Sequence, residues 1–168
     1  VVGAPLIAAL ASRMPRRRLL IGLGMLLTLG NLLSAIAPDF WSLMGARFLA
    51  GMPHGAYFGV ASLVGAAIAG EGRRAWAVTR MMLGLSVANV IGVPFAAWLG
   101  QQYGWRVAFL SIVVVGVINV IALIMLLGPV PNQKDASVRG ELSALKSAQV
   151  WLTLGVGAIG FGGVFALY

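Results

Sequence analysis

The stretch LASRMPRRRLLIGLG, residues 10–24, places four arginines between two apolar segments. Two interpretations compete for it: a basic patch for nucleic acid or targeting, or a short loop held at one face of a membrane. A nucleic-acid patch needs basic residues on a solvated face, mixed with polar or aromatic side chains. Here the basic residues lie at the ends of apolar segments, so we expect a membrane loop and no nucleic-acid partner.

Composition supports the membrane interpretation. The chain has 168 residues, 60% of them hydrophobic and only 10% charged, with a net charge of +8 and a mean hydropathy of +0.96. A soluble domain carries about 25% charged residues, because its surface must be solvated. The deficit of charge predicts an exterior that faces lipid. The absence of cysteine excludes disulfides, thiolate metal sites and cysteine nucleophiles within this chain.

Long uncharged segments recur along the chain. Those between successive charged residues hold 20 to 27 residues, and about 20 apolar residues cross the hydrocarbon core as a helix. Inside lipid the backbone must pair with itself, which favours helices. The sequence therefore predicts an all-α, polytopic membrane helix bundle. Its predicted segments are 1–12 (the end of a helix), 19–37, 43–68, 77–99, 105–128 and 149–168.

The connections alternate in charge. Ten of the twelve basic residues lie in segments 13–18, 69–80 and 129–148, whereas the other two, Arg47 and Arg106, lie near the opposite side. The positive-inside bias predicts that these three loops are cytoplasmic. The arginine cluster is then an anchor that contacts anionic headgroups of the lipid bilayer.

The longest connection, 129–148, is polar and contains two prolines. We expect it to be a cytoplasmic linker between two bundles. Residues 1–128 would form most of a first bundle, and residues 149–168 would be the truncated first helix of a second one.

Catalytic side chains are scarce. The four acids all lie in connections, and no pair of them is evident: Asp39, Glu71, Asp135 and Glu141. Acid–base or metal-assisted chemistry within the bilayer therefore has no carboxylate to use. We expect no enzyme activity, no metal and no cofactor.

Polar side chains within the predicted spans are the candidates for a transport pathway. Arg47 lies early in a span, where a charge either has a function or snorkels outward to the interface. His54 could titrate or bind a substrate, or it could form a neutral bridge between helices. Tyr57 and Asn89 are further candidates, and Asn89 lies close to a predicted kink.

Small residues recur every four positions in two of the segments. Gly51 and Gly55 belong to one series, and Gly84 and Gly92 belong to another, which Pro94 interrupts. Such stripes let helices approach closely, and proline invites a bend. Either packing alone or helices that rock against each other would explain them.

Several motifs together resemble the major facilitator superfamily. ALASRMPRRRLL is similar to its loop signature between the second and third helices, and ARFLAGMPHGAYFG is similar to its fourth-helix signature with a membrane arginine. GLSVANVIGVPFAAWLG resembles the fifth-helix signature of exporters, and GWRVAF opens a sixth helix. The resemblance is collinear from late helix two into helix seven. It is strongest to drug and sugar efflux permeases of the arabinose-efflux and chloramphenicol-resistance type.

The resemblance implies a fold and a function. The fold is the N-terminal half of a twelve-helix bundle plus the start of the second half, with substrate bound near the midplane. The function is secondary transport in the bacterial inner membrane, as a proton-coupled exporter of drugs or sugars that acts as a monomer by alternating access. A membrane-embedded binding or assembly protein that does not transport is the alternative.

The resemblance also implies a cytoplasmic latch. Its residues here would be Ser12, Arg13, Arg16, Arg17 and Arg18. Ser12 occupies the place of the family's aspartate, and Pro15 occupies that of its glycine. The charge-dependent part of the latch therefore departs from the family pattern.

Overall fold

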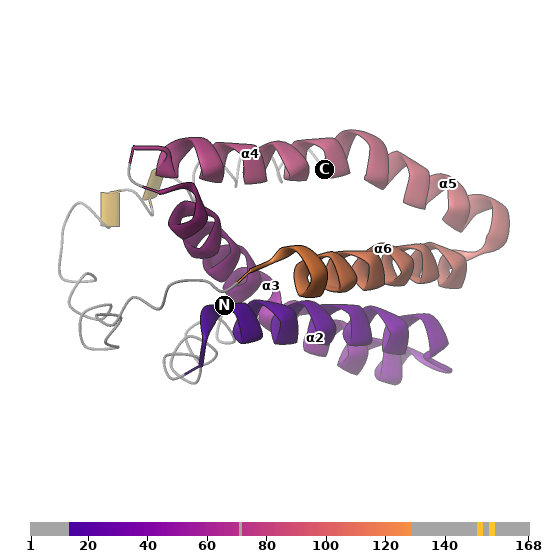
Figure 1. Ribbon diagram of the computed structural model, residues 1–168. Helices are drawn as coiled ribbons and strands as arrows, with labels where there is room; N and C mark the ends of the chain where they lie inside the picture. Colours follow the sequence, from indigo (N-terminus) through magenta and orange to yellow (C-terminus); the bar gives the residue numbers. More distant parts are fainter. Residues whose placement is uncertain (1–13, 71, 129–150, 153–154, 157–168) are drawn as a thin grey trace. The chain divides into compact units, whose positions relative to one another are not determined.

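The computed structural model describes residues 14–70, 72–128, 151–152 and 155–156 (Figure 1). The described residues form helices and turns and no strand, so the all-α prediction is confirmed. The chain divides into two compact units, Val1–Asn132 and Gln133–Tyr168, and the helices below belong to the first. The predicted segment 1–12, the linker 129–148 and most of 149–168 lie outside the described residues.

Four of the described helices are long and apolar enough to cross a membrane. One of them, Arg74–Tyr103, is built from two α-helices joined by a π-helical turn, η1. The elements are α2 (Arg16–Ile36), α3 (Phe40–Ala69), α4 (Arg74–Val87), η1 (Ala88–Gly92), α5 (Val93–Tyr103) and α6 (Trp105–Leu126).

Three helices, α2, α3 and α4, begin three residues earlier than the apolar pattern predicts. The structure starts α2 at Arg16 and α4 at Arg74, within segments that the sequence assigns to loops 13–18 and 69–80. The unpaired N–H groups of a first helical turn can be hydrated in the headgroup region, so a helix continues past the hydrocarbon that sets its apolar length. Arg16, Arg17, Arg18 and Arg74 therefore lie in first helical turns rather than in loops.

A capping box fixes the start of α3. The Ser42 N–H donates to the Asp39 carboxylate at 2.8 Å, and the Asp39 N–H donates to the Ser42 hydroxyl at 3.3 Å. The bond from the backbone N–H of Ser42, followed by that from its hydroxyl, holds the pKa of Asp39 below its ordinary value of 3.8. The cap satisfies donors that the first turn leaves unpaired, so α3 begins at Phe40.

Helix α2 lies at the centre of the packing. It packs against α3 on one side and α6 on another, whereas α4 packs against α3 and α5 packs against α6 (Figure 1). The main contacts of η1 are with its own flanking helices. The middle of the Arg74–Tyr103 span is therefore the least covered part of the described bundle.

Two glycines allow close approach to α2. A Cβ built on Gly30 would lie 2.7 Å from the Cβ of Ala50 in α3. A Cβ built on Gly116 of α6 would lie 2.5 Å from the Thr28 hydroxyl of α2. Both distances are shorter than a carbon atom tolerates, so the contacts require glycine. Neither residue belongs to the stripes that the sequence pattern selects.

Reciprocal arginine caps join the ends of α2 and α6. At the start of α2, Arg17 donates from Nε to the Leu127 carbonyl at 2.7 Å and from Nη2 to the Ile124 carbonyl at 2.8 Å. At the start of α6, Arg106 donates from Nη2 to the Ala37 carbonyl at 2.9 Å. The two helices are therefore antiparallel, and each supplies a cation to the carbonyl end of the other.

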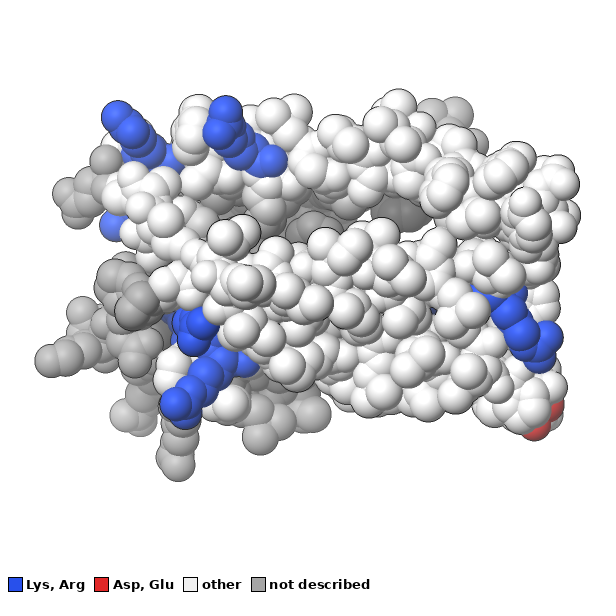
Figure 2. Space-filling view, turned by 45° about the vertical axis from the view of Figure 1, so that its right-hand side comes forward, with Lys and Arg blue, Asp and Glu red and all other residues white. Residues whose placement is uncertain are grey.

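Most described arginines lie at one end of the bundle. Five of them lie at the starts of α2 and α4, namely Arg16, Arg17, Arg18, Arg73 and Arg74, and Arg80 follows in the second turn of α4. Figure 2 shows the basic side chains gathered mainly at that end and acidic atoms at the opposite end. Asp39 lies at the opposite end, just before α3, and Arg106 lies there at the start of α6. The distribution agrees with the charge bias of the sequence.

Candidate functional site

Arg47 brings three helices together. It lies on α3, seven residues after Phe40, so its Cα is roughly 10 Å along the helix from its start. Its Nη1 donates to the Asn31 side-chain oxygen of α2 at 3.2 Å, and its guanidinium carbon lies 5.2 Å from the centre of the Phe109 ring of α6. Hydrogen bonding and cation–π attraction thus hold the charge from both sides.

Asn31 is itself held in place. Its side-chain nitrogen donates to the Leu27 carbonyl one turn earlier in α2, at 2.8 Å. This bond turns the amide oxygen of Asn31 towards Arg47. The sequence signal that points to Asn31 is a lone amide in an apolar segment, but its partner could not be read from the sequence.

A second polar cluster joins Tyr57 to Asn119. The Asn119 side-chain nitrogen of α6 donates to the Tyr57 hydroxyl of α3 at 2.9 Å. The bonded pair lies next to Gly24 of α2. A Cβ added to Gly24 would lie 3.7 Å from the Tyr57 ring and 3.8 Å from the Asn119 side-chain nitrogen. Both polar side chains are half-buried. Tyr57 lies near the middle of the 30-residue α3, so this cluster is close to the midplane of that helix.

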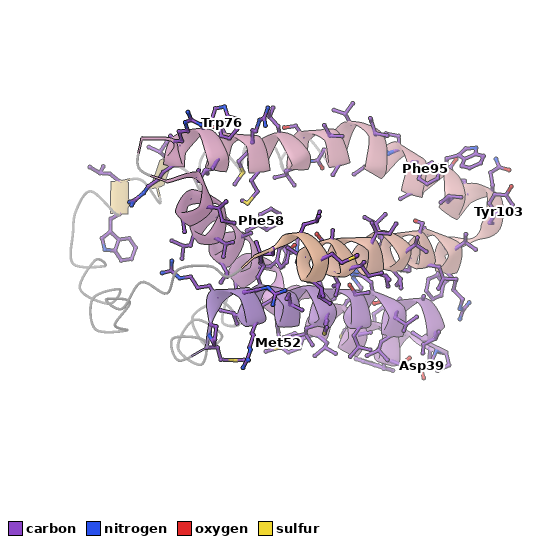
Figure 3. The ribbon with its side chains drawn as sticks, viewed as in Figure 1. Asp39, Met52, Phe58, Trp76, Phe95 and Tyr103 are labelled. Atoms are coloured by element: carbon purple, nitrogen blue, oxygen red, sulfur yellow. The ribbon has the colours of Figure 1, made fainter. Side chains whose placement is uncertain are left out.

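His54 belongs to neither cluster. Its side chain is exposed, and its ring centre lies 5.2 Å from that of Phe58, one turn further along α3, in an edge-to-face arrangement. Within the described residues it forms no hydrogen bond with Arg47 or Tyr57. The labelled Phe58 marks this part of α3 in Figure 3.

Asn89 lies in η1, at the middle of the Arg74–Tyr103 span, and its side chain is exposed. Gly92 ends η1, and Pro94 stands in the first turn of α5. Figure 1 shows that α4 and α5 run in different directions on either side of η1. The two residues selected for bending thus lie at the C-terminal end of the π turn, and π turns are frequent at functional sites.

Three of the four glycines selected from the predicted stripes have no close neighbours here. In the described part of the chain, a Cβ added to Gly51, Gly84 or Gly92 would meet nothing within 4 Å, and Gly55 is exposed. Their role in packing or rocking stays a prediction.

The latch residues fall into three groups. Ser12 and Arg13 lie outside the described residues, whereas Arg17 is bound to the carbonyl end of α6. Arg18 is exposed and Arg16 is partly buried. Arg17 therefore has a partner within this bundle, and the latch stays a prediction.

No group of three or more His, Cys, Asp or Glu side chains that could hold a metal occurs among the described residues. The described site therefore consists of the Arg47 and Tyr57 clusters, His54 and the π turn. It offers hydrogen-bond donors and acceptors and one fixed cation. Such groups can bind a small molecule reversibly.

Known proteins share this sequence pattern. The family model described as Major Facilitator Superfamily matches residues 1–168. The inner membrane transport protein YdhP of Escherichia coli (strain K12) is 43% identical over 168 residues, which are 100% of this chain and 43% of that protein. The uncharacterized MFS-type transporter YtbD of Bacillus subtilis (strain 168) is 34% identical over 167 residues, 99% of this chain and 42% of that protein.

A more distant relative carries a substrate class in its name. The probable sugar efflux transporter of Mannheimia succiniciproducens is 31% identical over 145 residues, 86% of this chain and 36% of that protein. The chain thus spans less than half the length of the curated relatives that it matches.

Proposed function

The chain belongs to the major facilitator superfamily, a family of membrane transporters, and on this premise we propose that the whole protein is a secondary exporter of drugs or sugars. It works by alternating access, as a monomer, and uses protons as the coupling ion. The name of one relative, an inner membrane transport protein, supports the location. The name of another, a probable sugar efflux transporter, supports sugars as one of the two substrate classes.

The observation that carries the proposal is the presence of polar side chains within helices that are long and apolar enough to cross a membrane. Arg47, Tyr57 and Asn89 lie within helices whose other side chains are mostly apolar, and two of them are held by partners from neighbouring helices. Ionisable and polar groups inside a membrane are costly and mark substrate or ion pathways. A bundle that only anchored the protein would have no need of them.

Arg47 is the fixed cation of the proposed pathway. One of its five N–H donors is used by Asn31, and its side chain is exposed, so the remaining donors are available to a polar solute. Because Asn31 and Phe109 belong to different helices, movement of α3 relative to α2 or α6 would change the position of this charge. Such a change is what an alternating-access cycle needs.

His54 is the proposed coupling residue of this chain. All four acids of the sequence lie in connections, so the imidazole of His54 is the proton acceptor that the predicted spans of this chain offer. Its exposed ring on α3 is accessible to a proton once the pathway opens to water.

The proposed orientation places the start of α2 and the start of α4 on the cytoplasmic side of a bacterial inner membrane. The five arginines at these two starts, with Arg80 in the second turn of α4, support it, because basic residues are retained on the cytoplasmic side. Loops 13–18, 69–80 and 129–148 are then cytoplasmic, and the exposed arginines contact anionic lipid.

Flux measurements on the full-length protein in proteoliposomes test the proposal. We expect export of a labelled sugar or a lipophilic dye to rise with an imposed pH gradient, and Arg47→Ala to abolish it. Arg74→Ala is the matched control, since it removes an exposed arginine at the start of α4. Unchanged flux in Arg47→Ala would remove Arg47 from the mechanism.

Two other outcomes separate the parts of the proposal. Flux that ignores the pH gradient would rule out proton coupling and leave transport intact. Correctly folded protein that moves no solute of the panel would favour a membrane-embedded binding or assembly protein.

A further inference from the structure

The π turn η1 removes a hydrogen bond from the backbone of Asn89. In an α-helix the N–H of Val93 would bond to the Asn89 carbonyl, four residues earlier. Here the Val93 N–H bonds to the Ala88 carbonyl instead, five residues earlier. The Asn89 carbonyl therefore loses its α-helical donor.

Proline removes the other possible donor. In the π-helical register the Asn89 carbonyl would receive a bond from the N–H of residue 94. That residue is Pro94, which has no N–H. The Asn89 carbonyl thus has no main-chain donor from its own helix in either register. An unpaired carbonyl at hydrocarbon depth is costly, so a donor from elsewhere is needed.

The face of α4 that leads to Asn89 meets another helix. Met81 and Leu85 are partly buried and precede Asn89 by two turns and one turn. The Met81 sulfur lies 3.9 Å from the Ser62 hydroxyl of α3, so this face turns towards α3. Asn89 follows four residues after Leu85, and its side-chain amide is exposed. Carbonyl and amide therefore belong to one uncovered place at mid-span.

We propose that Asn89 is a hydroxyl-binding subsite for a neutral, polyhydroxylated substrate. The backbone carbonyl accepts a hydrogen bond from a substrate hydroxyl, and the side-chain amide of Asn89 donates one to the same or a neighbouring hydroxyl. This inference rests on the proposed transport function and selects sugars over drugs within it.

Within this chain, charge favours a neutral substrate over a cation. A cationic ligand desolvated at mid-span requires a carboxylate as counter-charge. The four acids of the chain all lie in connections, and the one that the structure describes, Asp39, caps α3 at the end of the bundle. A hydroxyl group, which both donates and accepts, matches the carbonyl and the amide together.

The test restores the missing donor. Pro94→Ala gives residue 94 an N–H that can bond to the Asn89 carbonyl within the helix. Binding of D-glucose, D-galactose and their monodeoxy derivatives is measured on the full-length protein in lipid nanodiscs. We expect Pro94→Ala to weaken binding of the parent sugar about five- to tenfold, the size of one lost hydrogen bond. Binding of the derivative that lacks the bound hydroxyl should not change.

Two further variants keep the test independent of the bend. Asn89→Ala retains the proline and removes only the amide, and we expect it to weaken sugar binding by a similar factor. Ser86→Ala is the matched control, because the Ser86 hydroxyl bonds within its own helix to the Met82 carbonyl at 3.4 Å. It should bind every sugar as the unchanged protein does.

The opposing results are distinct. Equal weakening of parent and all deoxy sugars by Pro94→Ala, or no weakening at all, would overturn the subsite. No sugar binding alongside export of ethidium would also overturn it, but would leave the transport function standing. Absence of any flux by the folded protein would refute the proposed function itself.

Discussion

Removal of the Arg17 cap should loosen the joint between α2 and α6. In Arg17→Met the side-chain length is retained while two charge-assisted hydrogen bonds, to Leu127 and Ile124, are lost. A buried bond of this kind contributes about 1.5–3 kcal/mol. Because Arg17 is only partly buried and water can reach the end of α6, we take about 1 kcal/mol for each bond. The free energy of unfolding should therefore fall by about 2 kcal/mol.

The assay is equilibrium unfolding of the full-length protein in mixed micelles by increasing SDS, followed by tryptophan fluorescence. Arg106→Met removes one bond at the opposite end, to Ala37, and should cost about 1 kcal/mol. Arg17→Lys keeps the charge but not the two-pronged geometry, so it should recover about half of the loss.

Arg18→Met supplies the control. Arg18 is exposed, and no hydrogen bond of its side chain occurs within the described residues, so its replacement should leave the unfolding free energy unchanged. A loss in Arg18→Met as large as that in Arg17→Met would mean that general charge, rather than the two carbonyl bonds, stabilises this end. An unchanged free energy in Arg17→Met would refute the cap altogether.

Three further perturbations follow from the same contacts. Gly30→Val should destabilise the bundle by about 1–3 kcal/mol, because the new side chain would overlap Ala50. Gly51→Ala is the control and should not destabilise it, because a Cβ at Gly51 meets nothing. Equal effects of the two variants on SDS unfolding would contradict the close approach of α2 and α3. Tyr57→Phe removes the bond from Asn119 and should lower the free energy of unfolding by about 0.6–1.7 kcal/mol. A double-mutant cycle with Asn119→Ala that shows no coupling would contradict this interaction. The cap at Asp39 should depend on pH. Because the folded pKa is lowered, the carboxylate contributes stability above the unfolded value of 3.8 and loses it as pH falls through the folded pKa. The stability difference between the unchanged protein and Asp39→Ala should therefore shrink in acid, and a difference that persists below the folded pKa would show that ionisation is irrelevant.

The family and the helical fold could both be predicted from the sequence. The motifs around Arg47 and Pro94 indicated the major facilitator superfamily, and the match over residues 1–168 confirmed it. The segments 19–37, 43–68, 77–99 and 105–128 coincide with four described helices to within a few residues. Their ends were less predictable, since the headgroup region lets Arg16 and Arg74 join the helices.

The candidate site was predictable only as a set of residue types. An arginine, a tyrosine and an asparagine within apolar segments were recognisable, but their partners were not. Asn31 lies 16 residues from Arg47, and Asn119 lies 62 residues from Tyr57. The π turn was also hidden, since a proline predicts a bend and does not specify which carbonyl loses its donor.

The sequence alone determined that this protein lies in lipid, how many spans its described residues contain, and on which side of the membrane its basic residues gather. The length of the apolar segments and the order of the charged residues can be read along the sequence, and the bilayer responds to both directly. The tertiary structure decided which faces meet. It placed Gly30 against Ala50 and joined Arg17 to a carbonyl 110 residues away, because such contacts depend on the rotation of each helix about its axis.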